Sequence, residues 1–273
     1  MEKNRIIELQ KTRSLGELIS DSFIFLRIHA RALIGPYLVV TLPLAFLAVF
    51  PIISYSRAIT GGGLFNPAPT YGFPFHFTAE VFGSLFLMSA VFSLSFVAGM
   101  SSLLGYVDLL KATDGSLPSF SETLTAFGKY FPKMLLNSIP VFLLLILLTC
   151  LLIIPGIWFS IISFIFYPVL VLEGLSLSAG IARSRYLVKD YWWQTFLIII
   201  IASFMVGIIT GFVLITFIPA LLRVVLQLYI FVAVLLQYYN LKELKEGGSL
   251  TDRIAGLGQR SGDVIQPRRK EEF

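Results

Sequence analysis

Residues 134–172, MLLNSIPVFLLLILLTCLLIIPGIWFSIISFIFYPVLVL, form a run of 39 residues without a charged side chain. As a single helix the run would measure roughly 58 Å, about twice the ~30 Å hydrocarbon layer of a bilayer. The dipeptide Pro155-Gly156 lies near its middle, where proline interrupts helical hydrogen bonding and glycine permits a tight reversal. The run therefore predicts two membrane-spanning helices, 134–154 and 157–172, that fold back on each other.

The rest of the chain extends this pattern to an all-α integral membrane protein with six transmembrane helices arranged as three hairpins. Apolar runs at 32–54 and 81–105 form the first pair, and a stretch from 196 to 239 divides at Pro219 into spans 196–217 and 220–239. With 56% hydrophobic and 14% charged residues, the composition excludes an ordinary soluble domain. We divide the chain into a charged N-terminal segment (1–13), one membrane domain (14–246) and a mobile cytoplasmic tail (247–273).

The positive charges of the chain predict its orientation. Nineteen of the 21 lysines and arginines precede the first span, follow the last or lie in the links between pairs, and only Arg57 and Arg223 fall on the other side. The positive-inside rule then places both termini in the cytoplasm. The net charge of +5 is explained by this topology and by attraction to anionic lipid headgroups, so we expect no nucleic-acid partner.

Each predicted pair of spans follows a short segment with helical amphipathic periodicity, at 17–31, 120–131 and 178–192. Ser119 and Glu122 fit a capping box at the start of the second segment. We therefore expect three units, each an amphipathic interfacial helix followed by a membrane hairpin.

The third amphipathic segment contains the candidate site residues. On a helical projection Arg185 falls on the same side as Val188 and Trp192, so its charge needs a partner, and Glu173 at the end of the preceding span is the nearest acid. Two interpretations remain open: a structural clamp between Glu173 and Arg185, or a lipid-phosphate site that uses the same arginine.

Three further residues of this segment are predicted to anchor it at the membrane boundary. Trp192 and Trp193 fit the aromatic belt, and Lys189 lies one turn before them. The charges of Arg183 and Asp190 point to the opposite side and are expected to be solvated.

The residue inventory argues against an enzyme. The sequence contains no Gly-rich phosphate loop, nucleophile elbow or HExxH motif. His29 and His76 are its two histidines and are predicted on opposite sides of the membrane, while Cys150 is its single cysteine. We therefore expect no catalytic residues, no metal site and no cofactor.

Several short motifs resemble a known family. These are Pro155-Gly156-Ile157-Trp158, Glu173-Gly174, the run from Ala182 to Lys189 (ARSRYLVK), and Tyr238-Tyr239-Asn240-Leu241-Lys242. Together they are similar to the multi-pass bacterial family named for the membrane domain of glycerophosphoryl diester phosphodiesterases, over roughly residues 14–247. The resemblance implies the six-span fold and a bacterial cytoplasmic (inner) membrane. Relatives carry Asp and Arg where this chain has Asn240 and Lys242, and the catalytic phosphodiesterase domain is absent here.

Two classes of function remain. The predicted spans hold few ionisable groups at mid-bilayer, which favours a membrane scaffold, an accessory subunit or a lipid-interacting protein with the bilayer or another membrane protein as partner. The alternative is a small-solute or lipid transporter, in which small hydroxyl side chains and the proline bends would line the path.

Overall fold

The computed structural model describes residues 9–60, 79–113, 116–211 and 218–247, and every secondary-structure element in these ranges is a helix. Six helical stretches are long and apolar enough to cross a membrane, so the prediction of an all-α chain with six such stretches is confirmed. In chain order the elements are α1 (Leu15–Leu47), α2 (Val49–Thr60), α3 (Ala79–Ala112), α4 (Phe120–Leu151), α5 (Ile153–Leu172), α6 (Leu177–Val188), α7 (Trp192–Gly211), α8 (Ile218–Lys242) and the π-helical turn η1 (Glu243–Gly247).

The first two amphipathic segments are not separate helices, contrary to the sequence prediction. Residues 17–31 lie inside α1 and residues 120–131 lie inside α4, each continuous with the apolar stretch that follows. The physical reason is that a change in side-chain polarity does not end a helix, and Pro132, between the amphipathic part and the apolar run of α4, is accommodated inside that helix. Of the three amphipathic segments, only the third forms a separate helix, α6, which ends at Val188 rather than at Trp192.

Capping boxes set the first residues of both long helices. At α4 the Ser119 side chain accepts a hydrogen bond from the backbone N–H of Glu122, whose carboxylate accepts from the Ser119 N–H, as the sequence predicts. Ser14 and Glu17 make the same reciprocal pair at the start of α1. Because each box satisfies N–H groups that have no partner within the helix, it defines where the helix begins.

The turn between α4 and α5 lies earlier than the position of Pro155-Gly156 indicates. Leu152 adopts an extended backbone with φ −152° and ψ 122°, and α5 begins at the next residue. Pro155 then falls in the first turn of α5, where its missing N–H costs nothing because the first helical N–H groups have no intrahelical partner.

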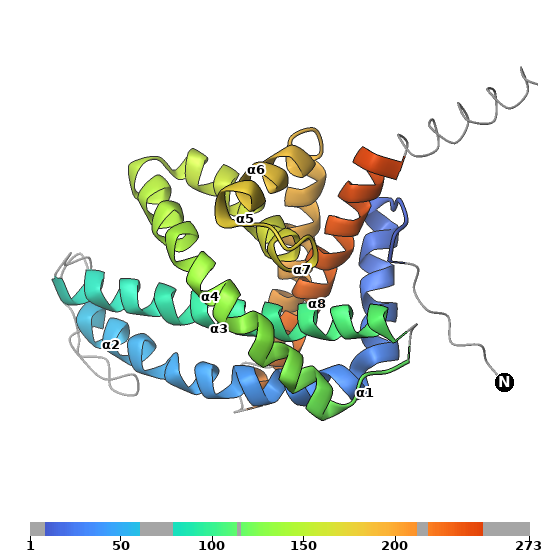
Figure 1. Cartoon of the computed structure of the whole chain (residues 1–273). Helices are drawn as coiled ribbons and strands as arrows, with labels where there is room; N and C mark the ends of the chain where they lie inside the picture. The colour runs from blue at the N-terminus through green and yellow to red at the C-terminus, as the bar shows by residue number, and fades with distance from the viewer. Residues whose placement is uncertain (1–8, 61–78, 114–115, 212–217, 248–273) are drawn as a thin grey trace, which may run out of the picture.

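Helix α6 runs back along α5 instead of leaving it at its end. Gly174, with φ +68°, makes the turn after α5 in a conformation that glycine adopts without strain. Gly180 then lies against the ring of Phe166, and Arg185 lies over the ring of Trp158, in the second turn of α5. Figure 1 shows α6 above α5 near the top of the view.

The buried core lies where α1, α3, α5 and α8 meet. Figure 1 shows α8 crossing α3, and the two helices are in contact. Gly99 of α3 lies between the fully buried rings of Tyr37 from α1 and Phe231 from α8. Phe231 also packs edge to face with Phe96, at a centroid separation of 5.0 Å. A small residue here allows three helices to approach closely, as is common between membrane helices.

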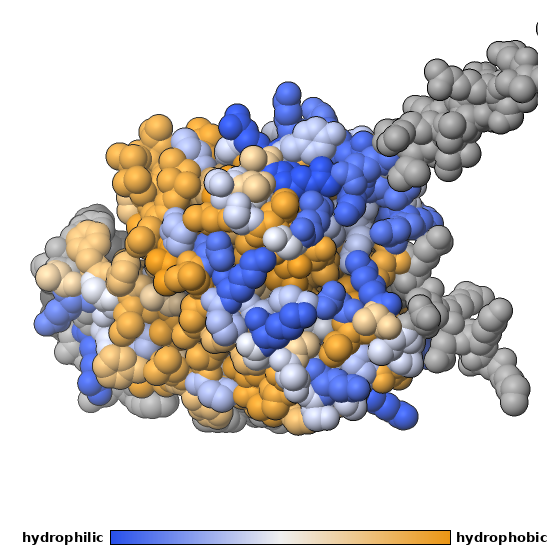
Figure 2. Space-filling model, in the orientation of Figure 1, coloured by the Kyte–Doolittle hydropathy of each residue, from blue (hydrophilic) through white to orange (hydrophobic). Residues whose placement is uncertain are grey.

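The outer surface of the helices is apolar over one part of the molecule. Ile154 is 81% exposed, Leu136 is 71% exposed and Phe204 is 66% exposed. In Figure 2 hydrophobic residues dominate the left part of the view, where α2, the start of α3 and the turn between α4 and α5 lie. Hydrophilic residues gather towards the right, near the N-terminal end of α1 and the C-terminal end of α8.

Some predicted segments lie outside the described residues. They include most of the charged N-terminal segment 1–13, most of the loop between the first two spans, the end of span 196–217 and the tail from 248 onward.

We predict that Gly99→Ala destabilises the protein by about 1–3 kcal/mol, because an added Cβ would lie 2.5 Å from the Phe231 ring and 2.9 Å from the Tyr37 ring. The matched control is Gly83→Ala in the same helix, where an added Cβ meets nothing within 4 Å. Unfolding of both variants in detergent, compared with wild type, measures the difference. Equal stability of the two variants would contradict this packing.

Candidate functional site

Glu173 is the centre of an ion-pair cluster that joins three helices. Its carboxylate accepts hydrogen bonds from Arg183 Nε at 2.9 Å, from Arg183 Nη2 at 3.3 Å and from the Tyr238 hydroxyl at 2.9 Å. Lys242 Nζ lies 3.6 Å away, and Arg183 also pairs with Glu246. The cluster therefore links the end of α5 to α6 and to the C-terminal part of α8 and η1.

The predicted pairing of Glu173 with Arg185 is replaced by one with Arg183. The two arginines are two residues apart, so their side chains project about 200° from each other around α6. The sequence did not show which side of α6 would face α8. Because α6 folds back along α5, Arg183 faces Glu173 at the end of α5. Arg185 instead lies over Trp158, which precedes Glu173 by 15 residues, roughly 22 Å along a helix. Arg183, expected to be solvated, is 21% exposed in this pair, and Glu173 is 13% exposed.

The cluster shifts the acidity of its members. Burial alone would raise the pKa of Glu173, but the hydrogen bonds from Arg183 and Tyr238 and the charges of Arg183 and Lys242 outweigh it and hold that pKa below its ordinary value. Burial lowers the pKa of Arg183, and its hydrogen bonds and Coulomb attraction to Glu173 and Glu246 more than reverse this. Both side chains of the pair are therefore charged at neutral pH.

A second polar group is buried where the residues just before α1 meet α8 and the first turn of α7. The backbone N–H of Arg13 donates to Asn240 Oδ1 at 2.7 Å, Asn240 Nδ2 donates to Gln237 Oε1 at 3.1 Å, and Gln237 Nε2 donates to Thr195 Oγ1 at 3.0 Å. The Arg13 guanidinium pairs with Asp21 at 2.8 Å. Sequence reasoning missed this chain because its first link joins residues 227 positions apart.

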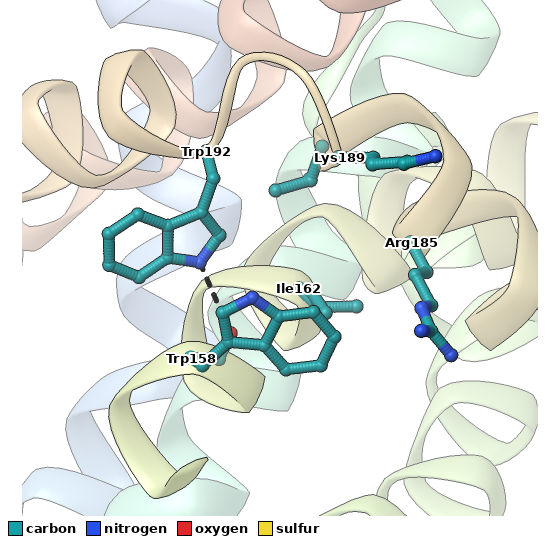
Figure 3. A pocket seen from close by; sticks show the side chains of 6 residues that line it. Trp158, Ile162, Arg185, Lys189 and Trp192 are labelled. Atoms are coloured by element: carbon teal, nitrogen blue, oxygen red, sulfur yellow. Dashed lines mark hydrogen bonds between the residues drawn. The ribbon is translucent and has the colours of Figure 1, made fainter. Parts of the chain in front are cut away.

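Arg185 lines a small cavity between α5, α6 and the start of α7 (Figure 3). The cavity has a volume of about 260 Å³ and is lined by Trp158, Ile162, Arg185, Val188, Lys189 and Trp192. The Arg185 guanidinium lies 5.6 Å from the centre of the Trp158 ring, and the Trp192 indole N–H donates to the Trp158 carbonyl at 3.4 Å. Figure 3 shows the Trp158 indole between Trp192 and Arg185, with Lys189 extending on the same side as Arg185.

The structure thus brings Arg185, Lys189 and Trp192 together and leaves Glu173 in a different group. Trp193 packs edge to face on Trp192 and is 70% exposed, on the outer side of α7. Sequence reasoning did not single out two residues of the cavity, Trp158 and Ile162. The only signal for Trp158 was its place in the Pro155-Gly156-Ile157-Trp158 motif, and Ile162 had none. Within the described ranges, no three His, Cys, Asp or Glu side chains lie close enough together to hold a metal ion.

No known family, curated protein or solved structure matches this chain. The resemblance to the membrane domain of glycerophosphoryl diester phosphodiesterases therefore stays a prediction. The Glu173 ion-pair cluster, the cavity beside Arg185 and the apolar surface are the features of the structure that bear on function.

We predict that Arg183→Gln destabilises the protein by about 2 kcal/mol, because it leaves a largely buried carboxylate with fewer partners. Arg185→Gln, which removes the same charge two residues later, should leave stability nearly unchanged. Thermal unfolding of the two purified variants compares them directly. A larger loss in Arg185→Gln would contradict the assignment of Arg183 as the partner of Glu173.

The lowered pKa of Glu173 predicts a pH-dependent contribution to stability. A carboxyl group whose pKa falls on folding stabilises the folded state above its ordinary pKa of 4.5, and this contribution disappears as pH falls through the folded-state value. The difference in melting temperature between wild type and Glu173→Gln should therefore be largest above about pH 5 and shrink as the solution is made more acidic. Asp190→Asn is the control, because that carboxyl is 60% exposed, so solvent screens its pairing with Lys245 and the difference should be smaller. A difference that grows on acidification would contradict the sign.

Proposed function

We propose that this chain is a non-enzymatic multi-pass membrane protein that acts as a scaffold, an accessory subunit or a lipid-interacting protein. The observation that carries the proposal is that the charged side chains at the junction of α5, α6 and α8 pair with one another. Glu173, Arg183, Lys242 and Glu246 join α5, α6 and α8. Charges held in this way support a fixed arrangement of helices, whereas alternating access needs groups of helices that move against each other.

The surface of the helices supports a partner within the bilayer. Large apolar side chains are exposed along α4 and α7, including Leu136, Leu143, Leu147, Leu197, Ile200 and Phe204. Such a surface is stable against hydrocarbon or against the apolar face of another membrane helix.

The orientation is part of the same proposal. We place both termini in the cytoplasm and the chain in a bacterial cytoplasmic (inner) membrane. Support comes from the distribution of lysine and arginine along the sequence and from the separation of hydrophobic and hydrophilic surfaces in Figure 2.

A transporter for small solutes or lipids is the second candidate. The observation that favours it is that two buried hydroxyl groups, Ser102 Oγ and Tyr239 Oη, have no hydrogen-bond partner within the described part of the chain. Unpaired polar groups inside a membrane protein are costly, so they mark positions where a translocated molecule could bind.

We test the proposal with a photo-crosslinking amino acid at two phenylalanine positions. Phe204 is 66% exposed on α7 within an apolar surface, and Phe120, 50% exposed in the first turn of α4, is the control. The proposal predicts discrete, reproducible adducts with a membrane protein or with lipid from Phe204 and few from Phe120. Purified protein in vesicles should also release no trapped carboxyfluorescein and transfer no fluorescent phospholipid above the protein-free rate.

The transporter alternative predicts the opposite result. Saturable dye release or lipid transfer would contradict the scaffold proposal if Tyr239→Phe abolishes it. That substitution removes only the unpaired hydroxyl group, so its effect would assign the transport to this position.

A further inference from the structure

We propose that the cavity formed by Trp158, Arg185, Lys189 and Trp192 binds the phosphate of an anionic glycerophospholipid at the membrane boundary. This inference rests on the proposed lipid-interacting role and names the ligand class. The cavity volume of about 260 Å³ equals that of roughly nine molecules of liquid water, at ~30 Å³ each. It therefore has room for a phosphate group with part of its hydration.

The charge of the cavity calls for an anion. Arg185 and Lys189 lie one helical turn apart, and like charges at this spacing repel each other. Neither forms an ion pair with a carboxylate in the described part of the chain, and the adjacent Asp190 pairs with Lys245 instead. A phosphate between the two cations would remove the repulsion, and the planar guanidinium of Arg185 suits its oxygens.

Two surface transitions place the cavity at the level of the headgroups. Along α5 the exposed residues before Trp158 are apolar, with Ile153 69%, Ile154 81% and Ile157 44% exposed. Along α7 the exposed residues after Trp192 are also apolar, namely Trp193, Leu197, Ile200, Phe204 and Ile208. On α7 Trp192 lies between Lys189 and this apolar surface, and on α5 the Trp158 ring, at the end of the exposed isoleucines, lies under the Arg185 guanidinium.

The two transitions meet in space, because Trp192 donates its hydrogen bond to the Trp158 carbonyl. Tryptophan side chains concentrate at the membrane boundary, where the indole is apolar and its N–H is polar. A lipid with its phosphate in the cavity would have exposed apolar helix surface beside it for its acyl chains. A lipid source for the phosphate therefore fits this position better than a phosphate ion free in solution.

The experiment uses the chain's own fluorescence, because all three of its tryptophans lie in or beside the cavity. The full-length protein is placed in phosphatidylcholine nanodiscs that contain a small fraction of brominated phosphatidylglycerol or, separately, of brominated phosphatidylcholine. We expect the brominated phosphatidylglycerol to quench the tryptophan fluorescence more strongly. Each cation that contacts the headgroup should raise the local concentration of this lipid about fivefold.

Two variants and one control test the named residues. Arg185→Gln should reduce the preference for phosphatidylglycerol by about fivefold, and Arg185→Gln/Lys189→Gln should abolish it. Lys129→Gln removes a cation from α4 and should retain the preference. Circular dichroism and melting temperature of each variant establish that it is folded.

Three outcomes would overturn the inference. Equal quenching by the two lipids in folded wild-type protein would show that the cavity does not select an anionic headgroup. If Lys129→Gln lost as much of the preference for phosphatidylglycerol as Arg185→Gln, the preference would be due to the net charge of the protein. Loss of the preference on adding inorganic phosphate, but not chloride at the same ionic strength, would assign the site to free phosphate. Any of these outcomes, together with discrete protein adducts from Phe204, would contradict the lipid site but support the proposed scaffold function. Saturable transport would contradict the scaffold function but would not change the quenching result.

Discussion

Exposed apolar helix surface is the constraint on which this structure depends. Six stretches have the length and composition to cross a bilayer, and side chains such as Ile154 and Phe204 remain largely exposed after the helices have packed together. In hydrocarbon the backbone must satisfy its own hydrogen bonds, and helices do so within each segment. Polar groups are then held where they can pair with one another or reach water, which explains why the ion pairs within the described ranges involve residues up to Asp21 and after Leu172.

Helix α6 reverses the roles that the sequence predicts for its two arginines. Arg183 forms ion pairs with Glu173 and Glu246 and stabilises the contact between α5, α6 and α8. Arg185, on the other side of the same helix, lies over Trp158 beside a cavity and has no carboxylate partner among the described residues. One arginine maintains the fold, and the other is left available to a ligand.

The sequence predicts those features that depend on composition over about 20 residues. The lengths of the apolar runs gave the six helical stretches, and the Ser119–Glu122 spacing gave the start of α4. It did not predict that α1 and α4 continue unbroken from their amphipathic part, because a change in side-chain polarity does not by itself end a helix. The choice of Arg183 over Arg185 depends on how α6 packs. The contact between Arg13 and Asn240 depends on the packing of α1 against α8.

We propose that the charged end of the helices, with α6, lies on the cytoplasmic side of the membrane. The direct test is a single cysteine at Tyr186, which is 50% exposed on α6, in a protein whose native Cys150 is replaced by serine. We predict that a membrane-impermeant maleimide labels Tyr186→Cys in inverted vesicles and not in intact spheroplasts, and that Thr70→Cys, in the loop predicted to face outside, behaves in the opposite way. Labelling of Tyr186→Cys in intact spheroplasts would contradict the account.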